Sequence, residues 1–187
     1  DTQALEQLLD QRMRVLAMIE SMEKPSIATL FGYCLGGGLE LPLACHFRLA
    51  ADTGASIGLP EVELGVVPAW GGTARLTRCV GRNHALDLML RARKIDGHEA
   101  LKIGLVHSVH PLAQLKAAAN ALARELAAMP PLAVAGILRC VVGAGAASLP
   151  DALAEERRAV LRCAGTRDQQ EGFAAFLAKR KPVFAGG

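Results

Sequence analysis

The sequence predicts an α/β fold in which short buried strands alternate with helices, followed by a region made only of helices. Two observations predict the α/β part. The apolar runs Ser26–Phe31 and Phe47–Ala51 are short and bounded by polar residues, proline or glycine, as buried strands of a parallel sheet are. Apolar residues before and after these runs recur at helical spacing. The third observation is that only helical patterns follow Pro130-Pro131.

The composition excludes several classes of protein. With 187 residues, of which 51% are hydrophobic and 21% charged, the chain suits roughly one folded domain and is not a disordered tail. A net charge of +3 and an aromatic content of 4% argue against a nucleic-acid partner. No apolar run reaches the length of about 18 residues that a membrane span needs, so we expect no membrane contact. The cysteines are dispersed, which indicates reduced thiols inside a cell: Cys34, Cys45, Cys79, Cys140 and Cys163.

The first part of the chain is predicted as helix, strand, helix and strand. The opening helix covers residues 1–22 and ends before Pro25, because the residue that precedes a proline avoids helical backbone angles. The first strand ends at Gly32, and the glycines after it form a tight turn into a short helix over Leu39–Cys45, with Pro42 near its start. The second strand is followed by a turn at Asp52–Ala55 and a short extended piece over Ser56–Pro60.

The remainder is predicted to be mostly helical. Glu61–Pro68 alternates in polarity and is expected to be extended, and one further strand is predicted over Leu105–Val109. Helices are expected over residues 71–80, 83–93, 97–103, 112–129, 132–142, 151–164 and 167–180. We place a domain boundary at Pro130, between a core over residues 1–129 and a C-terminal helical region over 130–187. The amphipathic helices of that region indicate packing on a neighbour.

A glycine run marks the first candidate site. Gly36-Gly37-Gly38 lies where a strand turns into a helix, so a ligand can approach bare backbone N–H groups at the positive end of the helix dipole. Such a site suits a developing oxyanion. Glu40 follows among leucines, and apolar surroundings raise the pKa of a carboxyl, as general acid–base catalysis requires. Taken alone, the glycines also fit a tight turn, and Glu40 also fits a residue that stabilises the helix dipole.

A second candidate acid, Glu61, directly follows Pro60, whose ring restricts the backbone and so the direction of the acid. Glu63 would point to the opposite face of an extended segment, so one of these two acids is expected to face solvent. Two carboxyls beside fixed N–H groups are what the addition of water to an activated double bond needs. One carboxylate deprotonates water, the other carboxyl protonates carbon, and the N–H groups hold the enolate.

Four segments together resemble the enoyl-CoA hydratase/isomerase (crotonase) family: Lys24–Cys45, Ile57–Leu76, Ala100–Val106 and Glu171–Lys181. The resemblance extends over essentially the whole chain. It implies a crotonase-like ββα spiral core with a C-terminal helical region through which copies associate, as a homotrimer or a dimer of trimers. A substantial part of the family's domain normally precedes the point where this sequence begins. We therefore expect the natural protein to start upstream, and the second oxyanion donor and much of the CoA-binding surface to lie there.

The resemblance implies roles for individual residues. The N–H of Gly37 corresponds to one oxyanion-hole donor, and Glu40 and Glu61 correspond to the two catalytic glutamates. Leu64 and Trp70 fall where the acyl pocket is usually lined. The positions implied to contact the substrate are Gly36, Pro60, Leu64, Trp70, Phe176 and Lys179, of which Phe176 and Lys179 correspond to residues that touch the CoA of an adjacent subunit. CoA enters as part of the acyl-CoA thioester substrate, and no metal or other cofactor is implied.

The reaction that the resemblance implies is the reversible hydration of a trans-2-enoyl-CoA to a 3-hydroxyacyl-CoA, a lyase reaction of fatty acid β-oxidation. Family members that shift a double bond usually lack the acid at the position of Glu40, so the pair favours a hydratase. Isomerisation, thioester hydrolysis and decarboxylation stay open, as does an inactive member that acts as a binding protein. The sequence leaves the division of acid and base roles between the two glutamates undecided.

Other features of the sequence are interpreted as structural. The turn over Asp52–Ser56 is one residue longer than the family's, and His46 stands where the family often has aspartate. His107 and His110 lack neighbouring ligands and are not expected to bind a metal. The cluster Lys179–Lys181 is expected to contact a phosphate of CoA. The composition indicates a bacterial cytoplasm, with the mitochondrial matrix as the alternative.

Overall fold

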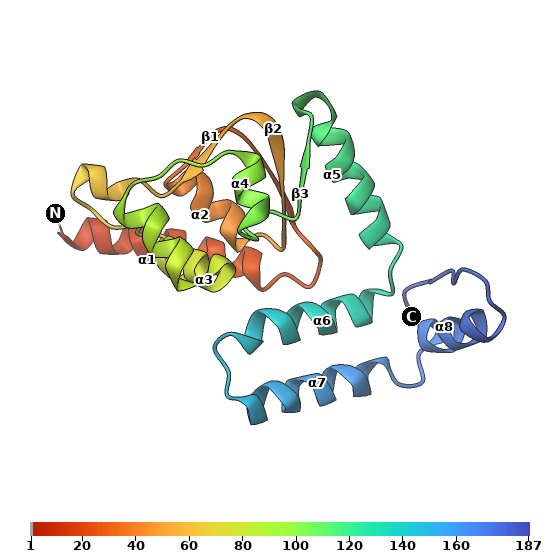
Figure 1. The fold of residues 1–187 in the computed structure, drawn as a ribbon. Coiled ribbons are helices and arrows are strands. Elements are labelled where there is room, and N and C mark those ends of the chain that lie inside the picture. The colour runs from red at the N-terminus through yellow and green to blue at the C-terminus, as the bar shows by residue number, and fades with distance from the viewer. Residues whose placement is uncertain (1) are drawn as a thin grey trace. The chain divides into compact units, whose positions relative to one another are not determined.

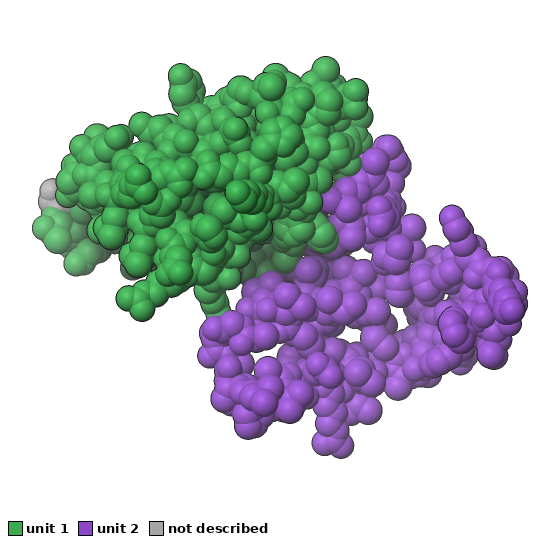
Figure 2. Space-filling view, in the orientation of Figure 1, with its two compact units in different colours: residues 1–20, 26–120 green, residues 21–25, 121–187 purple. Residues whose placement is uncertain are grey.

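The computed structural model describes residues 2–187, which form two compact units. The first comprises the residues up to Glu20 together with Ser26–Asn120, and the second comprises Ser21–Pro25 and Ala121–Gly187 (Figure 2). The division falls within helix α5 (Leu112–Ala127), whereas the sequence places a domain boundary at Pro130.

The first unit contains a parallel sheet of three strands in the order β1-β2-β3, covered by helices (Figure 1). The strands are β1 (Ile27–Leu35), β2 (Phe47–Gly58) and β3 (Ser108–His110). The helices of this unit, besides the start of α5, are α1 (Thr2–Glu20), α2 (Gly37–Ala44), the 3-10 helix η1 (Glu61–Leu64), α3 (Gly72–Leu90) and α4 (Gly97–Lys102). Parallel strands joined by helical crossovers confirm the predicted α/β class.

The strands differ from the prediction in length. β1 does not end at Gly32, because glycine takes the left-handed angle there (φ 61°) and the strand continues to Leu35. β2 continues through the predicted turn at Asp52–Ala55, and the extra residues form a bulge: Leu30 pairs with Ala50, but Gly32 pairs with Ala55. β3 is shorter than predicted and lies nearer the C-terminus.

The segment after Pro60 is also different from the prediction. Glu61–Leu64 is a 3-10 helix rather than an extended segment, because the N–H of Glu63 bonds back to the carbonyl of Pro60. Gly65 ends it with a left-handed angle (φ 69°). Glu63 is exposed and pairs with Lys94, so it is the acid that faces solvent.

Fully buried side chains anchor the segments that carry the candidate acids. Leu39 directly precedes Glu40 on α2, and Leu59 lies two positions before Glu61 at the end of β2. Both belong to one hydrophobic cluster, whose largest fully buried members are Leu30, Leu39, Ile57, Leu59, Leu76, Leu88 and Leu105. Burying a leucine contributes roughly 1.5–3 kcal/mol. The packing of Leu39 and Leu59 therefore fixes the backbone segments that carry the two acids.

Helix α2 is held at both ends. At its start, the N–H of Gly36 donates to the carbonyl of Gly58 over 3.1 Å, which joins the turn to the end of β2. At its end, the buried Arg48 guanidinium donates to the carbonyls of Pro42 and Cys45, a favourable position for a cation. Pro42 lies in the second half of α2 and not near its start, because the helix begins at Gly37 rather than at Leu39.

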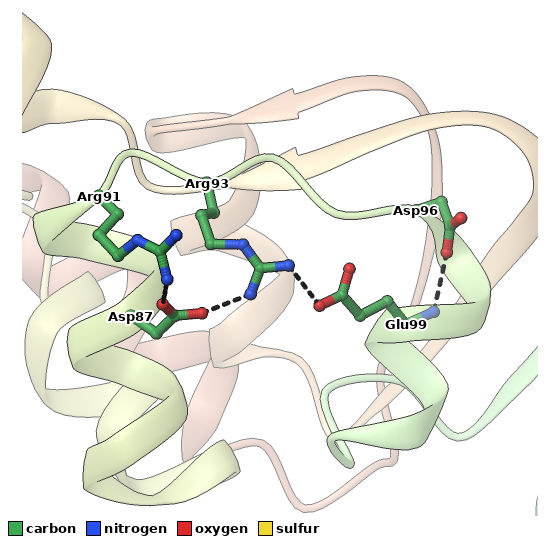
Figure 3. A network of polar contacts seen from close by, with 5 residues as sticks. All are labelled: Asp87, Arg91, Arg93, Asp96 and Glu99. Atoms are coloured by element: carbon green, nitrogen blue, oxygen red, sulfur yellow. Dashed lines mark hydrogen bonds and ion pairs between the residues drawn. The ribbon is translucent and has the colours of Figure 1, made fainter.

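A polar network supports the end of β2 from outside (Figure 3). Arg91 and Arg93 converge on the carboxylate of Asp87, and Arg93 also donates to Glu99 over 2.7 Å. Asp96 accepts the N–H of Glu99 and caps α4. The network holds the segment whose Ile95 pairs with Ile57 of β2.

The second unit consists of helices. It contains the end of α5, followed by α6 (Pro131–Ala144), α7 (Leu149–Cys163) and α8 (Arg167–Leu177). Gly136 of α6 lies so close to α7 that a Cβ there would be 3.0 Å from the Cβ of Ala159. Within residues 2–187, no single helix is long and apolar enough to cross a membrane, and the bent pair α5 and α6 meets that criterion of length and composition only when taken together.

Candidate active site

The turn into α2 is built from glycines that cannot be replaced without moving their neighbours. Gly36 has φ 55°, and a Cβ there would lie 3.0 Å from Oε1 of Glu61. A Cβ on Gly37 would collide with the indole ring of Trp70. The structure therefore brings Gly36 close to Glu61 and Gly37 close to Trp70.

The N–H of Gly37 is available to a ligand. Gly37 is the first residue of α2, and the first N–H groups of a helix have no partner inside it. Leu39 and Glu40 already donate to the carbonyl of Gly36, while the Gly37 N–H makes no hydrogen bond among residues 2–187. It lies at the positive end of the helix dipole, where a negative oxygen is stabilised.

Glu40 is buried, with 2% of its surface exposed, and is held by backbone groups. Its Oε1 accepts hydrogen bonds from the N–H groups of Trp70 and Gly72, each over 2.8 Å. Gly71 between them is left-handed (φ 93°), so successive N–H groups can converge on one anion. Gly72 has no room for a side chain, because a Cβ there would lie 2.7 Å from Oε1 of Glu40.

Glu61 is held differently. It is the first residue of η1, and its Oε2 is buried. This oxygen has no hydrogen-bond partner among residues 2–187. Burial raises the pKa of Glu61 above its ordinary value; its own backbone N–H lowers it, and the charge of Glu40 raises it. An unpaired buried carboxyl oxygen is costly, so its persistence indicates a site for water or for a substrate group.

Trp70 closes one side of the glycine turn. Its ring lies against Gly37, and the guanidinium of Arg12 from α1 stacks on the ring, 4.2 Å from its centroid. A largely apolar cavity of about 300 Å³ is lined by Trp70, Leu41 and several residues of α1, among them Arg12 and Leu16.

A smaller apolar cavity lies beside the segment that carries Glu61. Its volume is about 170 Å³, and it extends between the residues after Pro60 and the C-terminal half of α3. Its lining is entirely apolar except for Thr73 and includes Leu59, Val62, Val66, Val67, Pro68, Leu86, Met89 and Leu90. Leu64, which the resemblance implies lines the acyl pocket, is 80% exposed.

The remaining predicted site residues lie elsewhere in the chain. Pro60 precedes η1 and accepts the N–H of Glu63. Phe176 is 79% exposed near the end of α8, and Lys179 follows this helix with a left-handed backbone (φ 52°); both belong to the second unit. In the basic cluster, Arg180 donates two hydrogen bonds to the carboxylate of Glu171. This pairing lowers the pKa of Glu171 to about 2.

One further residue that the sequence singles out, His46, has contacts inside the first unit. Nδ1 of His46 accepts the N–H of Ser26, and its Nε2 lies 3.2 Å from the carbonyl of Glu20, so His46 joins the end of α1 to the start of β1. Within residues 2–187, no group of three or more His, Cys, Asp or Glu side chains is placed to hold a metal ion.

Sequence reasoning missed the groups that orient Glu40. The donors are the backbone N–H groups of Trp70 and Gly72, and any residue other than proline carries such a group. The available signal was the glycine pair Gly71-Gly72, which the sequence interpretation used only as the start of a helix.

Comparison with known proteins places this arrangement in a family. Residues 3–187 match the family described as enoyl-CoA hydratase/isomerase. A probable enoyl-CoA hydratase of Mycobacterium tuberculosis is 42% identical over 166 residues, which are 89% of this chain and 64% of that protein. A probable enoyl-CoA hydratase of Bacillus subtilis is 40% identical over 180 residues, 96% of this chain and 69% of that protein.

Comparison with solved structures points to the same family. An enoyl-CoA hydratase of Geobacillus kaustophilus superposes with a TM-score of 0.95 at 36% identity, covering 100% of this chain and 71% of that structure. The chain thus spans about two thirds of the length of the proteins that it matches.

Proposed function

The chain belongs to the enoyl-CoA hydratase/isomerase family, and we propose that it catalyses the reversible hydration of a trans-2-enoyl-CoA to a 3-hydroxyacyl-CoA. One observation carries the proposal. The carboxyl of Glu61, whose Oε2 is buried and unpaired, lies with its Oε1 against a glycine turn with an available N–H, and the charge of a second, firmly held carboxyl, that of Glu40, acts on Glu61. This is the combination that the addition of water to an activated double bond requires.

The Gly37 N–H supplies electrostatic stabilisation. When water adds to C3 of the enoyl group, negative charge develops on the thioester oxygen. A hydrogen bond from the N–H at the start of α2 and the helix dipole both stabilise that charge. Removing one such donor typically costs about 10²–10³ in rate.

The two carboxyls divide the proton transfers. Glu40 is oriented through Oε1, which leaves Oε2 to accept the proton of the attacking water. The raised pKa of Glu61 favours its protonated form, which donates its proton to C2. One proton leaves water and one reaches carbon, so the sum is the addition of H₂O, and a proton passing from Glu40 to Glu61 restores the starting state.

The apolar cavity beside η1 suits the acyl chain. Its volume of about 170 Å³ and its apolar lining fit a short unbranched chain, and its lining includes Leu59, two positions before Glu61. Trp70 lies against Gly37 and would confine the thioester end of the substrate.

Association of copies through the helical region belongs to the same proposal. Large apolar side chains are exposed along α6, α7 and α8, including Ile137, Val141, Val160, Phe173, Phe176 and Leu177. A neighbour that covers them would bring Phe176 and Lys179 to the CoA of an adjacent site. Sedimentation of the full-length protein should give a trimer or a hexamer, and a monomer at micromolar concentration would contradict this part.

The test follows the ultraviolet absorbance of the conjugated thioester with the full-length protein. A short trans-2-enoyl-CoA should lose absorbance, and Glu40→Gln and Glu61→Gln should each slow the loss by about 10²–10⁴. No change with the 2-enoyl substrate would overturn the hydratase proposal. A 3-enoyl-CoA that gains absorbance in both the wild type and Glu40→Gln would identify an isomerase instead.

A further inference from the structure

We propose that Arg75, anchored by Glu20, is a positioning residue that orients Glu40 through the backbone turn at Trp70–Gly72. The inference rests on the proposed function, in which Glu40 receives the proton of water. It concerns a residue that makes no hydrogen bond to Glu40 itself and acts through the backbone of Trp70.

The contacts form a continuous chain. From α3, the Nη1 group of Arg75 donates to the carbonyl of Trp70 over 2.9 Å. That carbonyl belongs to the peptide unit between the two N–H groups, of Trp70 and Gly72, that donate to Oε1 of Glu40. Holding this one carbonyl therefore limits rotation of the peptide units that carry both donors.

Arg75 is itself held rigidly. Its Nε and Nη2 both donate to Oε2 of Glu20, over 3.1 and 2.9 Å, at the last residue of α1. Its side chain is only 14% exposed, so this pair is shielded from water more than a surface ion pair is. A Cβ on Gly71 would collide with the guanidinium, which shows that Arg75 packs directly on the turn.

Helix α1 is thus linked to Trp70 in two ways, once directly and once through Arg75. Arg12 stacks on its ring, and Glu20 reaches its carbonyl through Arg75. An isolated salt bridge that only stabilised the fold would not need its third donor on the one carbonyl that lies between the ligands of a buried acid. The arrangement fits a role in keeping Glu40 aligned for proton transfer, where a small displacement costs rate.

The first test is a double-mutant cycle on hydration by the full-length protein. Arg75→Gln should lower kcat by about 10- to 100-fold and change KM by less than about threefold, because the substrate does not touch Arg75. In the Glu40→Gln background, Arg75→Gln should cost almost nothing further, because the group that it positions is gone. The matched control is Arg78→Gln, one turn along α3, which is exposed and makes no ion pair within residues 2–187; it should behave as wild type.

Several outcomes would overturn the inference. Losses from Arg75→Gln and Glu40→Gln that simply multiply would show that Arg75 acts on the fold and not through Glu40. Normal kcat in Arg75→Gln would show that Glu40 needs no positioning by Arg75, which also overturns the inference. If Arg75→Gln does not fold, Glu20→Gln replaces it, since it removes the anchor but keeps the guanidinium. Glu20→Gln should show a smaller loss of kcat that also disappears in the Glu40→Gln background.

A second readout does not depend on activity. Trp70 is the single tryptophan of the chain, so its fluorescence reports on this turn alone. Acrylamide quenching should increase in Arg75→Gln and stay unchanged in Arg78→Gln, while both proteins remain folded by circular dichroism. Equal quenching in the two variants would overturn the positioning role. A wild type that hydrates nothing but shows this difference in quenching would overturn the proposed function and leave the tether of the turn established.

Discussion

The first turn of α2 carries Glu40 and the first turn of η1 carries Glu61, and the structure holds these two glutamates in opposite ways. Glu40 directly follows the fully buried Leu39, is itself buried, and has one oxygen fixed by two backbone N–H groups. Glu61 follows a proline at the start of a short 3-10 helix and buries an oxygen with no partner among residues 2–187. Identical side chains therefore have different environments, because two backbone donors orient one oxygen of Glu40 whereas Glu61 keeps one buried oxygen with no donor.

The largest expected effect comes from removing either acid. Glu61→Gln and Glu40→Gln should each lower kcat of hydration by about 10²–10⁴, since each removes one proton transfer. If the two act as a unit, the double variant should be little slower than the slower single variant. Steady-state kinetics of the three variants check this. Fully multiplicative losses would show that the two carboxyls work independently, which would weaken the contrast in roles.

The donors to Glu40 give the next largest effect. Gly72→Ala places a Cβ 2.7 Å from Oε1 of Glu40, so the carboxylate must shift, and kcat should fall by about 100-fold. Gly143→Ala is the control, because nothing lies within 4 Å of a Cβ there and the residue is helical. This control should keep full activity and gain up to about 1 kcal/mol in the free energy of unfolding. Comparable activity in the two variants would contradict the role of the turn.

The unpaired oxygen of Glu61 makes stability depend on pH. The pKa of Glu61 is raised in the folded state, so its protonated form is favoured there, and the stabilisation is present at acid pH and lost as pH rises through the raised pKa. Glu61→Gln cannot ionise, so this variant avoids the cost of the desolvated carboxylate, which grows as pH rises. Its unfolding temperature should exceed that of wild type by a few degrees at pH 7, and the difference should vanish at pH 4. An equal difference at both pH values would contradict this titration.

The smallest effect is expected at the polar network beside β2. The arginines lower the pKa of Asp87, chiefly through the hydrogen bond from Arg93, so the pairing is present at neutral pH and lost as pH falls through that lowered value. These groups are accessible to water and ions, so Arg93→Gln should lower the unfolding temperature slightly at low salt and not at 1 M salt, where charges are screened within about 3 Å. Thermal scans at two salt concentrations check this, and a decrease that salt leaves unchanged would indicate a packing role instead. Hydration kinetics should not change.

Local patterns in the sequence were enough to predict much of the fold and part of the candidate site. Apolar runs, helical periodicity and glycine or proline punctuation predicted the α/β class and most helices within a few residues, and the motif around Gly36–Glu40 placed the glycine turn and the first acid. The errors came where a local signal had two meanings. Gly32 was interpreted as the end of a strand, although a left-handed glycine can also lie within a bulged strand. Alternating polarity after Pro60 predicted an extended segment where a 3-10 helix forms.

By itself, the sequence determined which chemical groups are present: two carboxyls, a glycine turn at a helix start, and a tryptophan after them. Only the tertiary structure decided how the groups differ. The donors to Glu40 come from a turn 30 and 32 residues further along the chain, the ring on Gly37 comes from the same turn, and Arg75 reaches that turn from α3 while bound to α1. Backbone N–H groups and desolvation cannot be recognised from the types of the residues. The physical reason is that they depend on which segments meet in space, and that is settled by packing around the common core.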